Sequence, residues 1–119
     1  MTPGEEEELM NVVSLTAVGD EQLALAKGTN SGRAALTIFG GHEHFLRQTV
    51  IALVGGRETS VHRSPGEATL QVLQGQVRVT AGDDTWQGAN GDFLVIPPGT
   101  HSVLAVEDAV MLLSTRADT

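Results

Sequence analysis

The sequence contains no cysteine and no tyrosine, and it has only three phenylalanines and one tryptophan among 119 residues. The absence of cysteine excludes disulfide bonds, thiolate catalysis and cysteine-ligated zinc or iron–sulfur centres. Because aromatic side chains are so few, we expect a hydrophobic core built from Val, Leu, Ile and Ala. Hydrophobic residues make up 40% of the chain, and a single domain of this length can bury a core without covalent cross-links.

Basic residues are also scarce, since seven Lys and Arg stand against fifteen Asp and Glu, for a formal net charge of -8. This balance argues against nucleic acid and anionic membranes as partners, because both are bound through clusters of positive charge. No apolar run approaches the roughly 20 residues of a membrane helix. The N-terminal Glu5–Glu8 run is the opposite of the basic start of a signal peptide. We therefore expect a soluble, cytoplasmic protein with a solvated acidic end.

The chain divides into an N-terminal arm over residues 1–33 and a single domain over residues 34–119. Within the arm, the segment Asp20–Lys27 is predicted to form a short helix. Its first residue fits an N-cap, its last residue suits the negative end of the helix dipole, and Gly28 fits the position just beyond the C-terminus. The arm is therefore expected to contribute one helix to a protein that is otherwise made of strands.

From residue 34 onward, short β-branched or apolar segments alternate with glycine, proline and acidic turns. Such a series, about eight strands at roughly ten-residue spacing, is typical of an antiparallel sandwich or barrel. Gln74–Gly75–Gln76 is predicted to be a hairpin turn, and Pro97–Pro98 must end a strand. The expected strands are Ala34–Phe39, Leu46–Val54, Thr69–Leu73, Val77–Thr80, a short one at Trp86, Phe93–Ile96, His101–Val106 and Ala109–Thr115.

Two partial motifs within residues 55–115 resemble those of the cupin superfamily, small β-barrels also called double-stranded β-helices. The first motif keeps both glycines and the first histidine at the family spacing, in Gly56, His62 and Gly75. The second keeps its glycines, proline and histidine, with one residue fewer before the histidine, in Gly91, Pro97, Gly99 and His101. The resemblance implies an all-β fold, an antiparallel cupin-type β-barrel (jelly roll) with a short N-terminal helix.

The resemblance also bears on metal binding, because metal-binding cupins hold a divalent ion with three histidines and one glutamate from these motifs. His62 and His101 stand at two of the four positions, but Ser64 replaces a histidine and Ala68 replaces the glutamate. A catalytic metal normally needs about three protein ligands. We therefore expect no metal cofactor. Two imidazoles and water could hold zinc or nickel weakly, and a weakly bound divalent metal at this pair is the alternative.

By the same resemblance, His62, Ser64 and His101 would line a ligand pocket at the barrel mouth. Arg47 and Gln48 are consecutive residues of the expected strand Leu46–Val54, so their side chains lie on opposite faces and one of them should face this pocket. Arg47 could pair with a ligand carboxylate. The alternatives are two histidines satisfied by water or backbone groups, and an arginine that faces solvent.

Two further features of the sequence are expected to have structural roles. His42-Glu43-His44 is a His-x-His sequence, but it has no glycine or glutamate at the family spacing and is expected to be a polar loop. Trp86 is expected to pack on the outer face of the barrel. The sequence holds no nucleophile constellation, phosphate-binding loop or dinucleotide fingerprint.

Three functions stay open at this level, because a fold alone does not decide function. The first is a non-catalytic cupin that binds a small molecule in a sensor or regulatory role. The alternative is a metal-dependent enzyme, dioxygenase- or isomerase-like, that uses His62 and His101, and the third is a structural or partner-binding protein. A homodimer is expected because Leu46–Val54 and Ala109–Thr115 are apolar at positions of both parities, and small cupins commonly dimerise through a sheet face.

Overall fold

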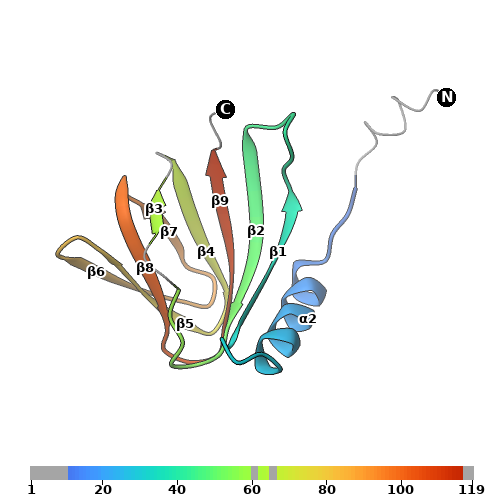
Figure 1. Ribbon diagram of the computed structural model, residues 1–119, viewed down its shortest axis with the longest axis horizontal. Helices are drawn as coiled ribbons and strands as arrows, with labels where there is room; N and C mark the ends of the chain where they lie inside the picture. Colours follow the sequence, from blue (N-terminus) through green and yellow to red (C-terminus); the bar gives the residue numbers. More distant parts are fainter. Residues whose placement is uncertain (1–10, 60–61, 65–66, 117–119) are drawn as a thin grey trace.

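The described part of the chain is a sandwich of two antiparallel sheets with one helix on its outside (Figure 1). This computed structural model describes residues 11–59, 62–64 and 67–116, without the side chains of 62–64. The larger sheet has the strand order β1-β2-β9-β4-β7 and the smaller one β3-β8-β5-β6. In the described part of the chain, no helix is long and apolar enough to cross a membrane. The elements are α2 (Leu15–Lys27), β1 (Arg33–Phe39), β2 (Leu46–Leu53), β3 (His62–Ser64), β4 (Ala68–Gln74), β5 (Gln76–Ala81), β6 (Asp84–Ala89), β7 (Phe93–Ile96), β8 (Gly99–Ala105) and β9 (Ala109–Arg116).

The predicted all-β fold is confirmed, and each of the expected strands is present within a few residues of its predicted bounds. The strand that sequence reasoning missed is β3. Its three residues, His-Arg-Ser, have neither β-branched side chains nor an alternation of apolar and polar residues, which are the local signals of a strand. β3 owes its conformation to pairing with β8 in the smaller sheet.

The predicted hairpin at Gln74–Gly75–Gln76 is wrong, because β4 and β5 belong to different sheets. Gly75 instead turns the chain from one layer to the other. Its φ of 85° is in the left-handed region, and a Cβ there would overlap the carbonyl oxygen of Asp108. Glycine meets both demands. The residue type at this position was therefore informative, but the local sequence does not distinguish a corner between sheets from a hairpin.

The helix is longer than predicted and begins at a different residue. α2 starts at Leu15, and its N-cap is Ser14, whose Oγ accepts a hydrogen bond from the Ala17 N–H over 3.1 Å. Asp20, the predicted N-cap, lies inside the helix. The C-terminal end is at Lys27 as expected, but Gly28 has a φ of -89° and so does not adopt the left-handed conformation usual for a glycine beyond a helix C-terminus.

The core between the two sheets is aliphatic, as the composition predicted. Its fully buried members include Leu53, Leu70, Val77 and Met111. No aromatic side chain of the described residues belongs to this buried cluster. The scarcity of aromatic residues is therefore met by close packing of branched side chains from both layers.

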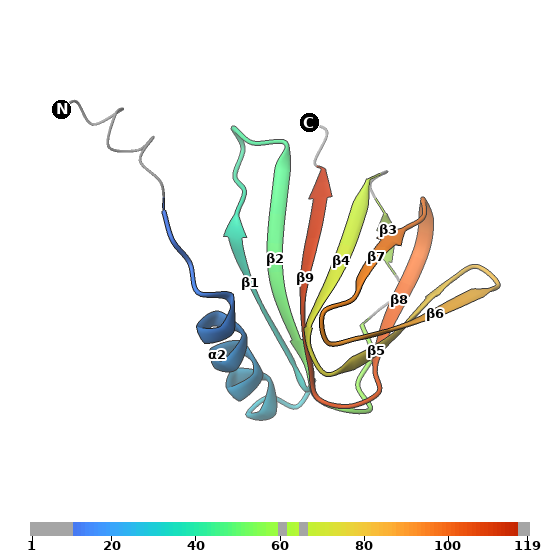
Figure 2. The ribbon, with the colours of Figure 1, turned by 180° about the vertical axis from the view of Figure 1, so that it is seen from behind.

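α2 lies on the outside of the larger sheet (Figure 2), and a second apolar cluster lies between the helix and this face. Leu23 and Ala26 of the helix pack there against Val50 and Val110. Gly19 allows the close approach, because a Cβ at that position would come within 2.9 Å of Val110 Cγ1. The helix thus covers the outer face of β2 and β9, which explains why these strands are apolar at both parities without invoking a second subunit.

A polar contact links the C-terminal end of α2 to two loops of the sandwich. Asp108 Oδ1 accepts a 2.8 Å hydrogen bond from the Gly55 N–H, and Lys27 Nζ lies 3.5 Å from Asp108 Oδ2. The Gly55 N–H and, secondarily, the Lys27 charge lower the pKa of Asp108 below its ordinary value. The carboxylate therefore helps to hold the helix against the end of the sandwich.

Candidate ligand-binding site

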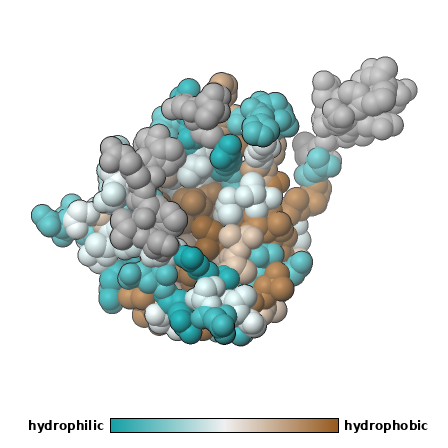
Figure 3. All heavy atoms as spheres, in the orientation of Figure 1, coloured by the Kyte–Doolittle hydropathy of each residue, from teal (hydrophilic) through white to brown (hydrophobic). Residues whose placement is uncertain are grey.

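A cavity of about 440 Å³ lies between the two sheets, within the range of about 300–1,000 Å³ typical of ligand pockets. Most of its walls are aliphatic, and its polar members are His101, Thr59 and Thr115. Hydrophobic residues gather at the centre of the face shown in Figure 3. The lining side chains are Ile51, Thr59, Ala68, Leu70, Ile96, His101, Val103, Met111, Leu113 and Thr115.

The register of β2 against β9 decides which of the two neighbouring polar residues of β2 lies on the cavity side. Ile51 lines the cavity, so Arg47 shares its face of the strand and is paired with the cavity-lining Thr115. Arg47 is exposed. Gln48 has the opposite parity, and its Nε2 donates to Ser114 Oγ over 3.2 Å. Arg47 is thus on the face of β2 that borders the cavity, and Gln48 is on the opposite face.

The two motif histidines are brought together by the pairing of β3 with β8. His62 and His101 are register partners in this antiparallel pair, and His101 lines the cavity. Ser64 pairs in the same way with Gly99. The side chains of His62 and Ser64 lie outside the described residues. Their roles in a pocket therefore stay predictions, whereas the position of His101 on the cavity wall is an observation.

Thr59 adds a polar group to the wall that sequence reasoning missed. Its N–H donates to the Val103 carbonyl over 2.9 Å, and its Oγ1 accepts from the Val103 N–H over 3.0 Å. Among the described residues the Thr59 hydroxyl accepts a hydrogen bond but donates none, so its hydrogen is able to bond to a ligand. No local sequence signal marks Thr59, because the pairing that holds it is long-range.

Ala68 forms part of the cavity wall at the position where metal-binding members of the resembled family carry glutamate. It is 5% exposed and pairs with Thr115 on one side and Ile96 on the other. Its methyl group offers no ligand atom, and the neighbouring Glu67 is exposed. Among the described residues, no group of three or more His, Cys, Asp or Glu is placed to hold a metal ion. The donors present there do not fit a three-ligand site.

The His42-Glu43-His44 sequence lies in the loop between β1 and β2, as predicted. The His44 ring stacks on Phe39 with centroids 4.6 Å apart, and its Nε2 lies 3.5 Å from Glu43 Oε1. All of these residues are exposed. The contacts give the loop a structural role.

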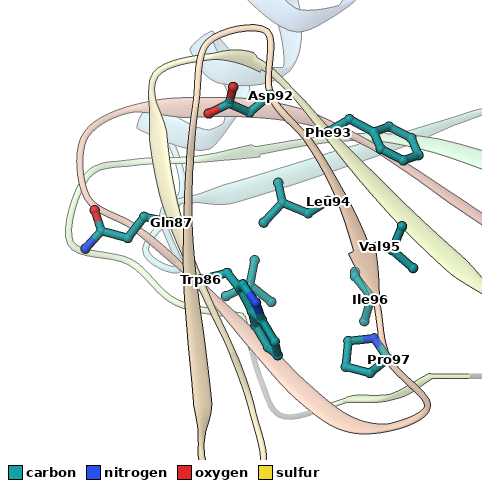
Figure 4. Close-up of a pocket in the computed structure, with 9 residues that line it drawn as sticks. Trp86, Gln87, Asp92, Phe93, Leu94, Val95, Ile96 and Pro97 are labelled. Atoms are coloured by element: carbon teal, nitrogen blue, oxygen red, sulfur yellow. The ribbon is translucent and has the colours of Figure 1, made fainter.

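A second depression of about 340 Å³ lies between β6 and β7, at the open side of the sandwich (Figure 4). Trp86 lies in it, with Leu94 and Ile96 across from the indole ring. The prediction that Trp86 packs on the outer face is wrong. Its register partner is Val79, a core residue, so Trp86 is on the inner face of the smaller sheet. It is still 41% exposed because β6 is the last strand of that sheet.

Residues 48–114 match the family model described as the cupin domain. The chain belongs to the cupin family. The match covers more than half of the chain and includes most of the cavity lining. The search of curated proteins returned no match.

Several solved structures resemble this cupin. A conserved protein of unknown function from Streptococcus pyogenes is 26% identical, with 93% of this chain and 90% of that chain covered and a TM-score of 0.71. A cupin superfamily protein from Desulfitobacterium hafniense is 18% identical over 72% and 78% of the two chains, with a TM-score of 0.66. A single-residue mutant of salicylate 1,2-dioxygenase from Pseudoaminobacter salicylatoxidans is 24% identical over 85% of this chain but 33% of the enzyme, with a TM-score of 0.70. The last two likenesses show the shared fold.

Proposed function

We propose that this cupin binds one small, largely apolar molecule in the cavity between its sheets and acts as a non-catalytic sensor or regulatory protein. The observation that carries the proposal is the 440 Å³ cavity, whose walls are mainly aliphatic. Binding buries the apolar surface of a ligand that fits such walls, which is the main source of affinity in pockets of this kind. We place the protein in the cytoplasm, in keeping with its acidic composition.

The polar residues of the wall define the rest of the ligand. His101 and Thr59 offer hydrogen-bonding groups from the β8 side, and Thr115 offers one from β9. Arg47 is the register partner of Thr115 and carries a positive charge on the same face of its strand. A molecule with an apolar body and a single carboxylate head fits this distribution, because arginine binds carboxylates through two parallel hydrogen bonds.

Ala68 supports a non-catalytic role. Its methyl group stands in the cavity wall where metal-binding cupins have a glutamate ligand. The site therefore lacks both that ligand and the negative charge that would balance a cation. The site has polar groups that can hold and orient a ligand. Among the described cavity residues, none is a carboxylate or a thiol, and His101 is the one side chain of the lining that could act as a general acid or base.

The second candidate is a metal-dependent enzyme of the dioxygenase or isomerase class. It rests on the opposed positions of His62 and His101 and on the structural likeness to salicylate 1,2-dioxygenase. Two imidazoles are fewer ligands than a catalytic metal normally takes. We therefore rank this candidate second.

The binding proposal is tested by calorimetric titration with cyclohexanecarboxylate, and with cyclohexanemethanol as the uncharged counterpart. Ala68→Leu puts extra carbon atoms into the cavity and is expected to weaken binding at least tenfold. Ala35→Leu is the matched control, since Ala35 is exposed on β1. Failure of both probes to bind the wild type, or equal binding by the two variants, would overturn the proposal.

The carboxylate preference is tested with Arg47→Gln, which removes the positive charge and retains a polar side chain. We expect the variant to lose affinity for cyclohexanecarboxylate and to keep its affinity for cyclohexanemethanol. If the wild type binds the acid and the alcohol equally, the cavity is an apolar site without selection for acids, and Arg47 has no role in it.

A further inference from the structure

One row of register partners crosses the inner face of the larger sheet along the cavity wall. Arg47 on β2 pairs with Thr115 on β9, and Thr115 pairs in turn with Ala68 on β4. Ala68 then pairs with Ile96 on β7. Thr115, Ala68 and Ile96 all line the cavity. Because neighbouring strands lie about 4.8 Å apart, this row, which we call the Arg47–Ile96 row, spans roughly 14 Å.

The far end of the row borders a second space. Ile96 is 2% exposed and lines both the cavity and the depression between β6 and β7. No other described residue lines both. Leu94, the preceding inward-facing residue of β7, lines the depression and lies across from Trp86 (Figure 4). The cavity and the depression are therefore neighbouring parts of the space between the sheets, and they meet at Ile96.

The smaller sheet continues the apolar lining in the same direction. Val103 of β8, a cavity residue, is the register partner of Val79 of β5, and Val79 is the partner of Trp86 of β6. Val79 and Trp86 line the depression. Both valines are buried, whereas the indole is partly exposed. The two sheets thus provide facing apolar walls from the cavity to the depression, with a partly exposed aromatic ring at the far end.

The two ends of this path carry opposite charges. At one end, the guanidinium group of Arg47 forms no ion pair with any described residue. At the other end, Asp92 lines the depression, and its Oδ2 accepts a 2.8 Å hydrogen bond from the Ala89 N–H. Ala68 and Ile96 are apolar residues between them. A ligand with one negative end and one uncharged apolar end matches this arrangement, and a ligand that is negative at both ends does not.

We propose that the ligand is an elongated monocarboxylic acid, whose carboxylate binds Arg47 and whose unbranched aliphatic tail passes Ile96 and ends beside Trp86. The inference rests on the proposed function, because it extends the ligand of the same cavity. A C–C bond of about 1.5 Å advances an extended chain by roughly 1.3 Å, so dodecanoate matches the roughly 14 Å of the Arg47–Ile96 row. Passage of the tail requires a change in the Ile96 side chain, which has alternative staggered rotamers.

The length of the ligand is tested by calorimetric titration with octanoate, dodecanoate and dodecanedioate below their micellar concentrations. Each buried methylene group tightens binding by about fourfold, so dodecanoate should bind at least about 30-fold more tightly than octanoate. Dodecanedioate is the matched ligand of equal length. It brings a second carboxylate to the depression that Asp92 lines, and it should bind at least about tenfold more weakly than dodecanoate. Equal affinities of the two twelve-carbon acids would overturn the inference.

The position of the tail is tested by fluorescence, since Trp86 is the single tryptophan of the chain. Saturation with dodecanoate should shift the emission to the blue, because the tail displaces water from an indole that is 41% exposed. Octanoate should leave the emission unchanged, because its chain ends before Ile96. Absence of the shift with dodecanoate, or the same shift with octanoate, would overturn the path past Ile96.

Two variants of the far end complete the test. Trp86→Asp places a carboxylate beside the tail and should weaken dodecanoate binding by at least about tenfold, without a change for octanoate. Trp86→Leu is the matched control, because it keeps the end of the path apolar and should retain most of the dodecanoate affinity. Cooperative thermal melts establish that both variants are folded. Equal dodecanoate affinities of the two variants would contradict a tail beside residue 86.

Failure of this inference is distinguishable from failure of the proposed function. If octanoate and cyclohexanecarboxylate bind and dodecanoate binds no more tightly than octanoate, the ligand space ends at Ile96. The proposed function then stands, and the elongated ligand is wrong. If none of these acids binds the wild-type protein, both are wrong.

Discussion

His62 on β3 and His101 on β8 stand directly opposite each other across an antiparallel pair of strands. The two residues come from separate motifs in the sequence, and only the pairing of these strands makes them neighbours. Ala68, on the facing sheet, lines the same cavity as His101. Two histidine positions of a family metal site are thus kept next to each other, while the glutamate position is apolar.

The first prediction concerns the metal content of the wild-type protein. We expect that a strong chelator leaves the melting temperature unchanged, because the motif supplies at most two imidazole ligands, and a structural metal is thermodynamically linked to folding. His62→Ala and His101→Ala should each change stability only modestly. Elemental analysis of untagged protein is the companion measurement. Near one equivalent of iron, manganese or zinc that is lost in His62→Ala would contradict the prediction and favour the enzyme.

The second prediction is that Ser64→His together with Ala68→Glu restores a metal site. The double variant should be less stable than the wild type without metal, because a carboxylate in an apolar wall is poorly solvated. Addition of zinc should then raise its melting temperature, since a ligand at about 100 times its Kd contributes about 2.7 kcal/mol. Ser64→His with Ala68→Gln is the control, which has similar shape but lacks the charged ligand. An equal response of both double variants to zinc would show that position 68 does not face the histidines.

The third prediction concerns the start of α2. Ser14→Ala should lower the free energy of unfolding by about 1 kcal/mol, because it removes the side-chain acceptor for a free N–H of the first turn. Asp20→Ala should change it little, because Asp20 is an exposed residue inside the helix. Urea denaturation of the two variants measures the difference. A larger loss of stability in Asp20→Ala than in Ser14→Ala would contradict the assignment of Ser14 as the N-cap of α2.

The fourth prediction follows from the lowered pKa of Asp108. A carboxyl group with a depressed pKa in the folded state contributes stability above its unfolded pKa, and this contribution is lost as the pH falls through the folded pKa. Asp108→Asn should therefore be less stable than the wild type near neutral pH, and the difference should shrink below about pH 4. Asp83→Asn, which removes the same charge from an exposed turn, should show no such trend in thermal melts at several pH values. A difference that stays constant down to about pH 2 would contradict the assigned Gly55 hydrogen bond.

The sequence by itself determined the fold class and the greater part of the strand bounds. Local sequence signals are sufficient for these features, because a short apolar segment between glycine and proline turns favours a strand. The sequence also determined that position 68 cannot ligate a metal, since the alanine side chain has no ligand atom in any fold. The aliphatic core followed from composition alone.

Only the tertiary structure decided which strands share a sheet and which faces are covered. The turn at Gly75 is compatible with a hairpin or with a corner, and the choice depends on contacts of β4 and β5 with strands far away in the sequence. In the same way, the apolar outer faces of β2 and β9 could be covered by a partner subunit or by a helix of the same chain. The structure shows that α2 covers them, since it packs on Val110. Trp86 was misplaced because its face depends on pairing with Val79. Pairing between distant segments sets these outcomes, and no local propensity encodes it.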